Sequence, residues 1–320
     1  MRRATFLKGL GALALAPSIA RAQGAYPDKQ IRMVIPFAPG GTTDLLARAV
    51  GQHFSQAWGQ TGIADNRAGA NGVVAGEIVA TAPGDGYSLS VFAMGYAINP
   101  LIYKKLPYDG DKDFTPISLI ATFPQLVLVH PQVKARTLAE LIALAKAATP
   151  PVTYASGGNG SSQHLAGALL SHMAGVSMTH VAYKGGNPAQ LDLMAGNVNM
   201  MITQPNSADL ITSGKMRALA VSSARRSTYY PDLPTVAEGG VPGYASVAWY
   251  GLVGPKGMPE ALVKKIADEA VRASKTEGVK GIVAGQGGDM VAGSPGEFAS
   301  FIAAERTRYA AIVQAAGMIV

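Results

Sequence analysis

The feature that most constrains this chain is an alternation of short β-branched runs with longer helical patterns, repeated along its 320 residues. Residues 31–35 and 152–156 are rich in strand-forming types, while 44–58 places apolar residues on one face of a helix. Such alternation is typical of α/β proteins with largely parallel sheets, so we expect that fold class. Further strands are expected at 89–92, 125–130, 180–183, 198–202 and 217–221.

Two helix starts carry a capping box, in which a hydroxyl residue is followed three positions later by Glu. Thr137 precedes Glu140 before one helix, and Ser294 precedes Glu297 before another, with Pro295 at the first helical position. The second pattern predicts a helix that runs to about residue 316.

Length and composition favour two lobes and a large apolar core. A chain near 300 residues lies close to the size at which a single core stops growing. Hydrophobic residues make up 48% of the sequence and charged residues 15%, which excludes a disordered chain. With no cysteine, the chain has no disulfides, zinc–thiolate sites or cysteine nucleophiles.

The first 22 residues have the three parts of an export signal. They begin with basic residues, continue with an apolar stretch at 10–16 and end with A-R-A, a small-x-small cleavage site. We expect a signal peptide over residues 1–22, cleaved after Ala22, and export to the periplasm by general secretion or by the twin-arginine route. The apolar stretch is too short to span a bilayer, which needs about 20 residues.

Most of the formal net charge of +7 belongs to this segment. The chain has 27 basic and 20 acidic residues, and four of the bases but none of the acids lie within residues 1–22. The mature chain therefore has 23 basic against 20 acidic residues, a net charge of +3. Such a balanced chain is not expected to bind nucleic acid.

Two distant segments share the order strand, glycine-rich turn, hydroxyl-bearing cap and helix. We call the turns turn 1 (residues 39–43) and turn 2 (residues 157–162). Glycines before a helix start let an anion approach unpaired backbone N–H groups, and the helix dipole favours negative charge there. A plain strand-to-helix connection explains either turn alone, but two in different lobes favour a cleft for a small anion.

Other chemistries have little support. Turn 2 lacks the Lys of a P-loop, and Gly40-Gly41 is not the glycine pattern of dinucleotide-binding folds. The sequence has no nucleophile elbow and no H-E-x-x-H zinc motif, and its five histidines include no pair four residues apart. We therefore expect no catalytic residue, cofactor or metal, and a carboxylate as the anion.

Several side chains near the turns allow two interpretations. His164 and Asp44 lie in the first turn of a helix, where they either cap and pack or touch the ligand. Lys184 follows a strand and is either solvated or directed into the cleft. Trp249 and Tyr250 belong to an apolar run and are either core residues or a wall against the ligand.

Ordered motifs over nearly the whole mature chain resemble the periplasmic receptors of tripartite tricarboxylate transporters, the Bug family. The opening strand and ligand loop of that family are similar to YPDKQIR at 26–32 and VIPFAPGGTTD at 34–44. Further matches are DNRAGANG at 65–72, DGY at 85–87, AINP at 97–100, LPYD at 106–109, SGGNGSSQHLAG at 156–167, YKG at 183–185 and LPTVAE at 233–238.

The resemblance implies a flytrap fold of two α/β lobes, each a mainly parallel sheet flanked by helices, joined by two crossover strands. With crossovers near Phe123 and Ser222, lobe 1 would comprise residues 26–122 and 223–320, and lobe 2 residues 123–222. The resemblance also implies that one ligand carboxylate lies between the two turns, held mainly by backbone N–H groups and ordered water.

Two departures from the family pattern concern the far end of the ligand. Residues 92–96 (FAMGY) are more apolar than the family pattern there, and residues 203–206 (TQPN) lack an acid that is common at this place. These differences favour a monocarboxylate or dicarboxylate with apolar or aromatic character over a free amino acid.

The sequence thus predicts a solute-binding protein rather than an enzyme, a monomer that captures a small carboxylate and delivers it to membrane permease subunits. Alternatives are a periplasmic sensor, a receptor for another importer, and a secreted α/β hydrolase or lyase. The residues expected to contact the ligand are Phe37, Pro39, Gly40, Gly41, Thr42, Thr43, Asp44, Met94, Tyr96, Ser156, Gly157, Gly158, Asn159, Gly160, Ser161, Ser162, His164, Tyr183, Lys184, Gly185, Gln204 and Asn206.

Overall fold

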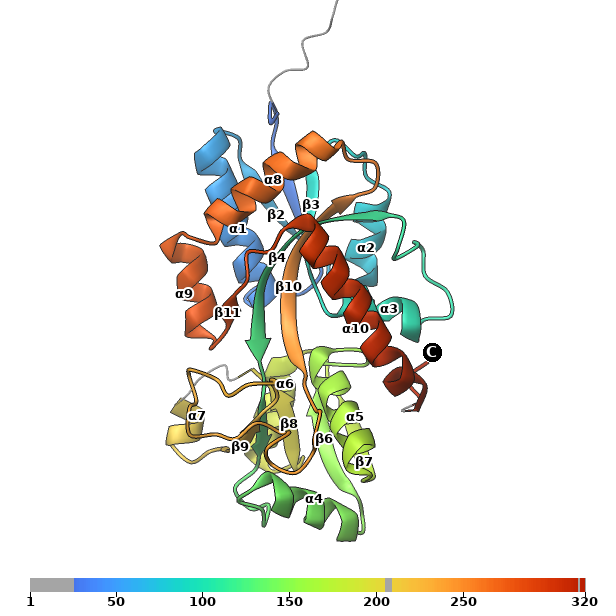
Figure 1. The fold of residues 1–320 in the computed structure, drawn as a ribbon, viewed down its shortest axis with the longest axis vertical. Helices are drawn as coiled ribbons and strands as arrows, with labels where there is room; N and C mark the ends of the chain where they lie inside the picture. Colours follow the sequence, from blue (N-terminus) through green and yellow to red (C-terminus); the bar gives the residue numbers. More distant parts are fainter. Residues whose placement is uncertain (1–25, 205–208, 316, 320) are drawn as a thin grey trace, which may run out of the picture.

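The computed structural model describes residues 26–204, 209–315 and 317–319. These residues form two β-sheets flanked by helices, one above the other along the long axis of the molecule (Figure 1). The expected two-lobed α/β architecture is confirmed. The predicted signal peptide and the predicted ligand contact Asn206 lie outside the described residues.

The first sheet contains six strands in the order β11-β4-β10-β3-β1-β2. β1 pairs in parallel with β2 and β3, whereas β10 pairs antiparallel with β3 and β4, and β11 antiparallel with β4. The bounds are β1 (Ile31–Ile35), β2 (Gly62–Asn66), β3 (Ser88–Ala93), β4 (Phe114–Pro124), β10 (Val247–Pro255) and β11 (Asp289–Met290).

The second sheet contains five strands in the order β7-β6-β8-β5-β9. β6 pairs in parallel with β7 and β8, and β5 pairs antiparallel with β8 and β9. The bounds are β5 (Leu126–Val129), β6 (Val152–Ser156), β7 (Met178–Ala182), β8 (Met200–Thr203) and β9 (Arg217–Val221).

Both sheets are therefore mixed, which corrects the expectation of mainly parallel sheets. The antiparallel pairs involve the strands that enter or leave a lobe: β4 and β10 run in opposite directions between the lobes and pair with each other. The hydrophobic pattern of a strand does not record its direction, so the alternation in the sequence could not reveal these pairs.

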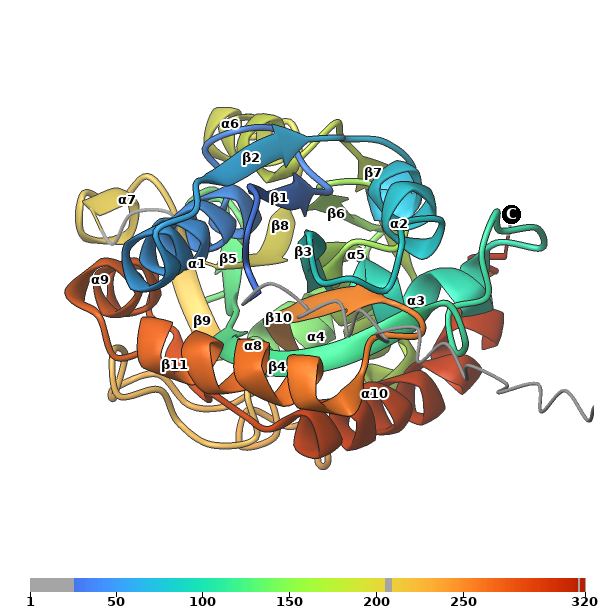
Figure 2. The same ribbon diagram turned by 90° about the horizontal axis from the view of Figure 1, so that it is seen from above.

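Helices cover both faces of each sheet. In β1, Ile31, Met33 and Ile35 belong to one core cluster with α1, α8 and α9, whereas Val34 belongs to another with α2, α3 and α10. Figure 2 shows these two groups on opposite faces of the first sheet. The bounds are α1 (Thr42–Trp58), α2 (Val73–Ala80), α3 (Gly95–Ile102), α8 (Glu260–Ala273), α9 (Glu277–Gly285) and α10 (Pro295–Ala315), with a short 3-10 turn η1 (Ala70–Gly72) before α2.

The second sheet is enclosed in the same manner. Val127, Val129 and Ile202 lie with α4 and α5 in the cluster that also contains Val34 of the first sheet, and Leu126 and Leu128 lie in another cluster with α6 and α7. Side chains of successive strand residues point to opposite faces, which explains both divisions. The bounds are α4 (Leu138–Ala147), α5 (Ser162–Ala174), α6 (Gly186–Ala195) and α7 (Asp209–Thr212).

The sequence signals for helix starts are confirmed. Thr137 accepts from the N–H of Glu140 at 3.2 Å before α4. Before α10, Ser294 and Glu297 bond reciprocally: the Ser294 N–H donates to Glu297 Oε2 at 2.8 Å, and the Glu297 N–H donates to Ser294 Oγ at 3.3 Å.

The chain leaves the first sheet at Gln125, between β4 and β5, and returns in β10. Residues 222–246 remain against the second sheet: Thr235 bridges to Val221, and the Tyr244 hydroxyl donates to the carbonyl of Ala166 at 3.0 Å. The lobe boundaries at 122/123 and 222/223 stay a prediction, and these contacts favour a second crossover nearer Ser246.

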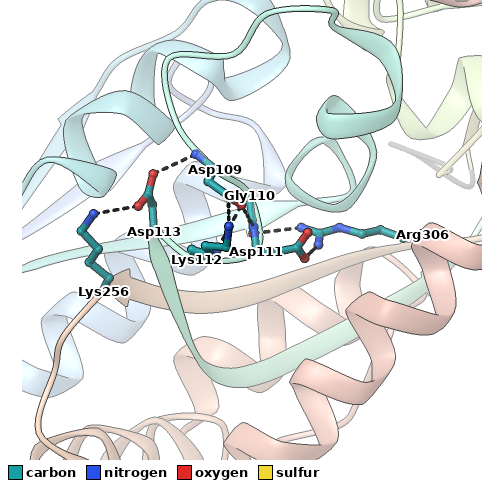
Figure 3. A network of polar contacts seen from close by, with 7 residues as sticks. All are labelled: Asp109, Gly110, Asp111, Lys112, Asp113, Lys256 and Arg306. Carbon is teal, nitrogen blue, oxygen red and sulfur yellow. Dashed lines mark hydrogen bonds and ion pairs between the residues drawn. The ribbon is translucent and has the colours of Figure 1, made fainter.

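A polar network fastens the loop before β4 to the end of β10 and to α10 (Figure 3). Lys256 Nζ donates to Asp113 Oδ1 at 2.9 Å, and Arg306 donates to the carbonyl of Gly110 at 2.9 Å and pairs with Asp111. Arg306 also donates to the carbonyl of Ala97 at 3.1 Å. The network therefore holds α3, the loop and α10 together on one side of the first lobe.

Candidate ligand-binding site

Turn 1 connects β1 to α1. The helix N-cap is Gly41, and Thr42 is already the first helical residue, which corrects the expectation of a hydroxyl cap at this turn. Thr42 Oγ1 instead donates to Gln286 Oε1, just after α9, at 2.5 Å. Gly40 has φ +87°, a left-handed conformation that glycine adopts without steric cost.

Asp44, in the first turn of α1, supports turn 1. Asp44 is 3% exposed. Its carboxylate accepts hydrogen bonds from the Gly40 N–H at 3.0 Å and from the side chains of Arg48 and Asn66, each at 2.9 Å. Burial alone raises the pKa of Asp44, but hydrogen bonds from Arg48, Gly40 and Asn66 outweigh it and lower the pKa below its ordinary value. These contacts favour the capping interpretation over contact with a ligand.

Turn 2 connects β6 to α5, and here the hydroxyl cap is confirmed. Ser161 is the N-cap, and its Oγ accepts from the N–H of His164 at 3.3 Å while donating to the carbonyl of Gly158 at 2.7 Å. The turn packs on residues 183–186, because a side chain at Gly157 would lie 3.1 Å from the Gly186 nitrogen. The conformation of turn 2 is thus held by hydrogen bonds and packing contacts within the second lobe.

Several N–H groups of the turns are already used by the chain itself. The acceptors are side chains that fold back from the following helix or from the end of the preceding strand. The pairs are Gly40 with Asp44 (3.0 Å), Gly157 with Gln163 Oε1 (2.9 Å), Gly158 with Ser156 Oγ (3.1 Å) and Gly160 with His164 Nδ1 (3.2 Å).

Other N–H groups at the two helix starts remain without a partner among the described residues. Those of Thr42 and Thr43 in turn 1, and of Asn159 and Ser162 in turn 2, make no hydrogen bond with the described residues. Thr43 is 4% exposed. Buried backbone N–H groups in proteins nearly always have a partner, so an acceptor is expected at turn 1.

His164 packs and caps behind turn 2. Its ring is 6% exposed and stacks on His180 with the ring centroids 3.6 Å apart, and Ser156 Oγ lies 2.6 Å from His180 Nε2. Burial and the neighbouring His180 lower the pKa of His164 to about 3, and burial lowers that of His180 to about 4. Both rings are neutral near pH 7, so His164 Nδ1 can accept the Gly160 N–H.

Asn71, on the first lobe, contacts turn 2 of the second lobe. Asn71 Nδ2 donates to the carbonyl of Gly160 in turn 2 at 3.0 Å. Asn71 also lines a small cavity of about 10 Å³ together with Phe37, which precedes turn 1, and with Tyr96. This space is about the size of one water molecule.

Tyr250 lies at a second junction of the lobes. Gln204, after β8, and the hydroxyl of Tyr250 on β10 are 3.5 Å apart. Burial raises the pKa of Tyr250, while its hydrogen bonds to Gln204 and to Thr42 of turn 1 lower it. Trp249 is fully buried against Phe298, which supports the core interpretation for that residue.

The remaining predicted contacts differ in position. Tyr96 is buried and lines the small cavity, where burial raises its pKa to about 12, whereas Met94 is 1% exposed in the core and does not line that cavity. Tyr183 donates to Asp192 at 2.6 Å, and Lys184 is exposed. Pro39 is exposed and Gly185 half-buried, at the edges of turns 1 and 2.

A larger cavity of about 530 Å³ lies beside turn 2, whose Asn159 belongs to its lining, and no residue of turn 1 lines it. It is lined by Tyr154, His164 and His180 on the second lobe and by Gly317 and Met318 after α10. We place the candidate site at the turns rather than here, because the unpaired N–H groups of both lobes are at the turns.

Sequence reasoning missed the amides that organise the site, namely Asn71, Asn99, Gln125, Gln163 and Gln286. Their partners are distant in sequence or on another element, and amide residues are common on surfaces. A signal existed only for Asn71, because Asn between glycines is typical of left-handed backbone. Asn71 has φ 51° and ψ 39°.

Two negative findings concern the described part of the chain. None of its helices is long and apolar enough to cross a bilayer. No cluster of three or more metal-ligating side chains occurs within these residues.

Comparisons with known proteins identify the family. Residues 46–318 match the tripartite tricarboxylate transporter family receptor. Protein BugT of Bordetella pertussis is 34% identical over 91% of this chain and 90% of its own. An R. palustris protein solved with adipate is 34% identical, with a TM-score of 0.82 over 91% of this chain and 98% of its own. MatC from Rhodopseudomonas palustris, solved with bound malate, is 31% identical, with a TM-score of 0.81 over 90% of this chain and 100% of its own. On sequence and fold alike, this chain belongs to the Bug-type receptors of the tripartite tricarboxylate transporter family.

Proposed function

We propose that the protein is a periplasmic receptor that binds a small carboxylate between turns 1 and 2 and delivers it to a membrane permease. Its family members are binding proteins, and the proposal is that this chain too acts without catalysis, cofactor or metal. Delivery to permease subunits, action as a monomer and export through residues 1–22 are parts of the same proposal.

The observation that carries the proposal is the set of unpaired N–H groups at two helix starts, one in each lobe. Those of Thr42, Thr43, Asn159 and Ser162 have no acceptor among the described residues. Both helix dipoles favour negative charge at these positions. A carboxylate has acceptor positions for all four and requires no Arg or Lys beside it.

The expected binding energy of these hydrogen bonds indicates that apolar contacts also contribute to affinity. Hydrogen bonds to a charged group contribute roughly 1.5–2 kcal/mol each, so four supply ~6–8 kcal/mol before the cost of association. Micromolar affinity corresponds to about 8 kcal/mol. Apolar contacts must therefore supply the difference.

We propose that an aromatic cluster beside the small cavity makes such contacts. Phe92 stacks on Tyr96 with the ring centroids 5.2 Å apart, and Phe114 contacts both rings edge-on. Adipate and malate, bound by two structural relatives, are both dicarboxylates. We propose a monocarboxylate or dicarboxylate with an apolar or aromatic body rather than a free amino acid.

A binding screen tests the proposal. Unfolded and refolded protein, stripped of carried-over ligand, is screened by thermal shift against aliphatic and aromatic carboxylic acids, and hits are measured by titration calorimetry. We expect a ligand-dependent rise in melting temperature without turnover. Tight binding of aspartate or glutamate with no binding of other acids would contradict the ligand class, and conversion of a bound acid would contradict the receptor.

Proline substitutions test the location of the site. Gly41→Pro and Gly158→Pro disturb the two turns separately. Gly296→Pro is the matched control, because it lies in the first turn of α10, where the backbone N–H has no helical partner and an added Cβ meets open space. We expect folded turn variants to lose affinity at least tenfold. Folded variants with unchanged affinity would exclude the turns as the anion site.

A further inference from the structure

Asn71 is the side chain that joins the first lobe to turn 2. It lies in the short 3-10 turn before α2, between Gly69 and Gly72, and none of the sequence signals for ligand contact includes it. We propose that Asn71 is a closure latch, a positioning residue that holds turn 2 against the first lobe and thereby sets the rate at which a bound carboxylate is released. This inference rests on the proposed function.

The hydrogen bonds of Asn71 link both lobes through one amide group. Its Nδ2 donates to the carbonyl of Gly160 at 3.0 Å and to Asn99 Oδ1 at 3.1 Å. Asn99, 1% exposed in α3, returns a bond from its own Nδ2 to the Asn71 carbonyl at 3.1 Å. One amide hydrogen is therefore held within the first lobe, which aims the other at turn 2.

The backbone of the latch is fixed before the lobes meet. Asn71 has left-handed dihedral angles, φ 51° and ψ 39°, which Asn tolerates better than most residues. Its carbonyl is pressed against Gly95, where an added Cβ would lie 2.6 Å from the Asn71 oxygen. The donor is thus preorganised, and little conformational freedom is lost when it finds its acceptor.

The acceptor side is equally tight. Gly160 is buried, and an added Cβ there would lie 2.7 Å from Ile102 Cδ1 and 2.9 Å from Asn71 Nδ2. Only glycine lets the lobes approach to this distance.

The position of Gly160 in turn 2 connects the latch to the ligand donors. Its carbonyl belongs to the peptide unit that leads into Ser161, the N-cap, and the next residue, Ser162, carries one of the unpaired N–H groups. The N–H of Gly160 is held from inside its lobe by His164. Turn 2 is therefore held by one hydrogen bond from within its own lobe and by another from Asn71 of the first lobe. Only the bond from Asn71 breaks when the lobes separate.

Two substitutions separate the parts of the latch. Asn71→Gly keeps the left-handed backbone and removes the amide. Asn71→Asp keeps the shape and replaces the donor by an oxygen that faces the Gly160 carbonyl and Asn99 Oδ1. The control is Ala70→Asp, which adds the same charge at the neighbouring exposed residue, also left-handed with φ 44°.

The measurements are stopped-flow dissociation of adipate and malate and the radius of gyration from small-angle X-ray scattering. Loss of one neutral hydrogen bond predicts that Asn71→Gly releases ligand roughly three- to tenfold faster, and Asn71→Asp faster still. The melting temperature of the ligand-free variants should change little, because neither substitution removes a residue of the hydrophobic core clusters.

The outcomes distinguish the latch from the proposed function. Faster release in both Asn71 variants, with Ala70→Asp like the wild type, supports the latch. Wild-type release rates in Asn71→Gly, or an equal effect of Ala70→Asp, overturn it. If the wild type binds no carboxylate, the proposed function fails, and scattering still decides the latch: a wild-type radius of gyration in Asn71→Asp overturns it, and a larger radius supports it.

Discussion

At the scale of single residues, His164 shows how a side chain that resembles a ligand contact can instead support the loop that binds. The neutral ring accepts the N–H of Gly160 through Nδ1 and stacks on His180. Protonation turns Nδ1 into a donor, which removes the acceptor of that N–H and places positive charge beside a second imidazole.

This arrangement predicts a dependence of stability on pH. Burial and His180 lower the pKa of His164 from 6.5 to about 3 in the folded protein, so between these values the unfolded chain binds more protons. The stabilisation is complete above about pH 6.5 and is lost progressively as the pH falls toward 3. The free energy of unfolding can be measured in urea at pH 7.5, 6, 5 and 4. In the His164→Asn variant, which keeps an acceptor but does not titrate, it should fall less steeply with decreasing pH than in the wild type. An equal decline in both proteins would contradict the assignment.

At the scale of elements, the packing of α10 across the first sheet depends on one glycine of β10. A Cβ at Gly251 would overlap the ring of Phe298 in α10, so the helix lies as close to the strand as backbone permits. The sequence predicted this helix and its cap. It did not predict the distance between the helix and the sheet, because Gly251, which sets that distance, has no side chain and adds nothing to a hydrophobic pattern.

We expect Gly251→Ala to destabilise the protein by about 1–3 kcal/mol, because the added methyl group overpacks the contact between helix and strand. Gly296→Ala is the matched control. It lies in the first turn of α10 with open space around the added Cβ, and should leave stability unchanged or raise it by about 0.5–1 kcal/mol. Denaturant unfolding of both variants measures the difference, and equal stabilities would contradict this account of the packing.

At the scale of the whole molecule, a buried hydroxyl network connects the chain segments that pass between the lobes. Ser222 Oγ accepts from the N–H of Gln125 at 2.8 Å and donates to the carbonyl of Ser246 at 2.5 Å. Ser246 Oγ lies 2.9 Å from the hydroxyl of Tyr309 in α10. These hydrogen bonds therefore connect both chain segments that pass between the lobes with α10. One hydrophobic core cluster also includes residues of both lobes.

Ser222→Ala leaves the N–H of Gln125 buried without a partner, and we expect a loss of about 1–3 kcal/mol in the free energy of unfolding. The lobes should also separate more readily, seen as a larger radius of gyration in X-ray scattering. Ser223→Ala serves as the comparison, because that hydroxyl is exposed and bonds only to the carbonyl of Arg225. Similar behaviour of the two variants would show that the network does not control the hinge.

The sequence alone determined the fold class, the family, most of the strands, the two glycine-rich turns and four helices, which the structure places at α1, α4, α5 and α10. These depend on local periodicity and on motifs in which neighbouring residues act together, such as the reciprocal bonds of Ser294 and Glu297. Strand direction in the mixed sheets was not determined, because antiparallel and parallel strands share the same alternation of side chains.

Only the tertiary structure decided which groups of the turns remain available. The sequence marks every glycine of turns 1 and 2 as a possible donor, but Asp44, Gln163 and His164 fold back and occupy several of those N–H groups. Asn71 likewise acquires its role only through its distance from Gly160, 89 residues away along the chain. Hydrogen bonds between distant residues depend on separations of tenths of an ångström, which packing fixes and local sequence does not record.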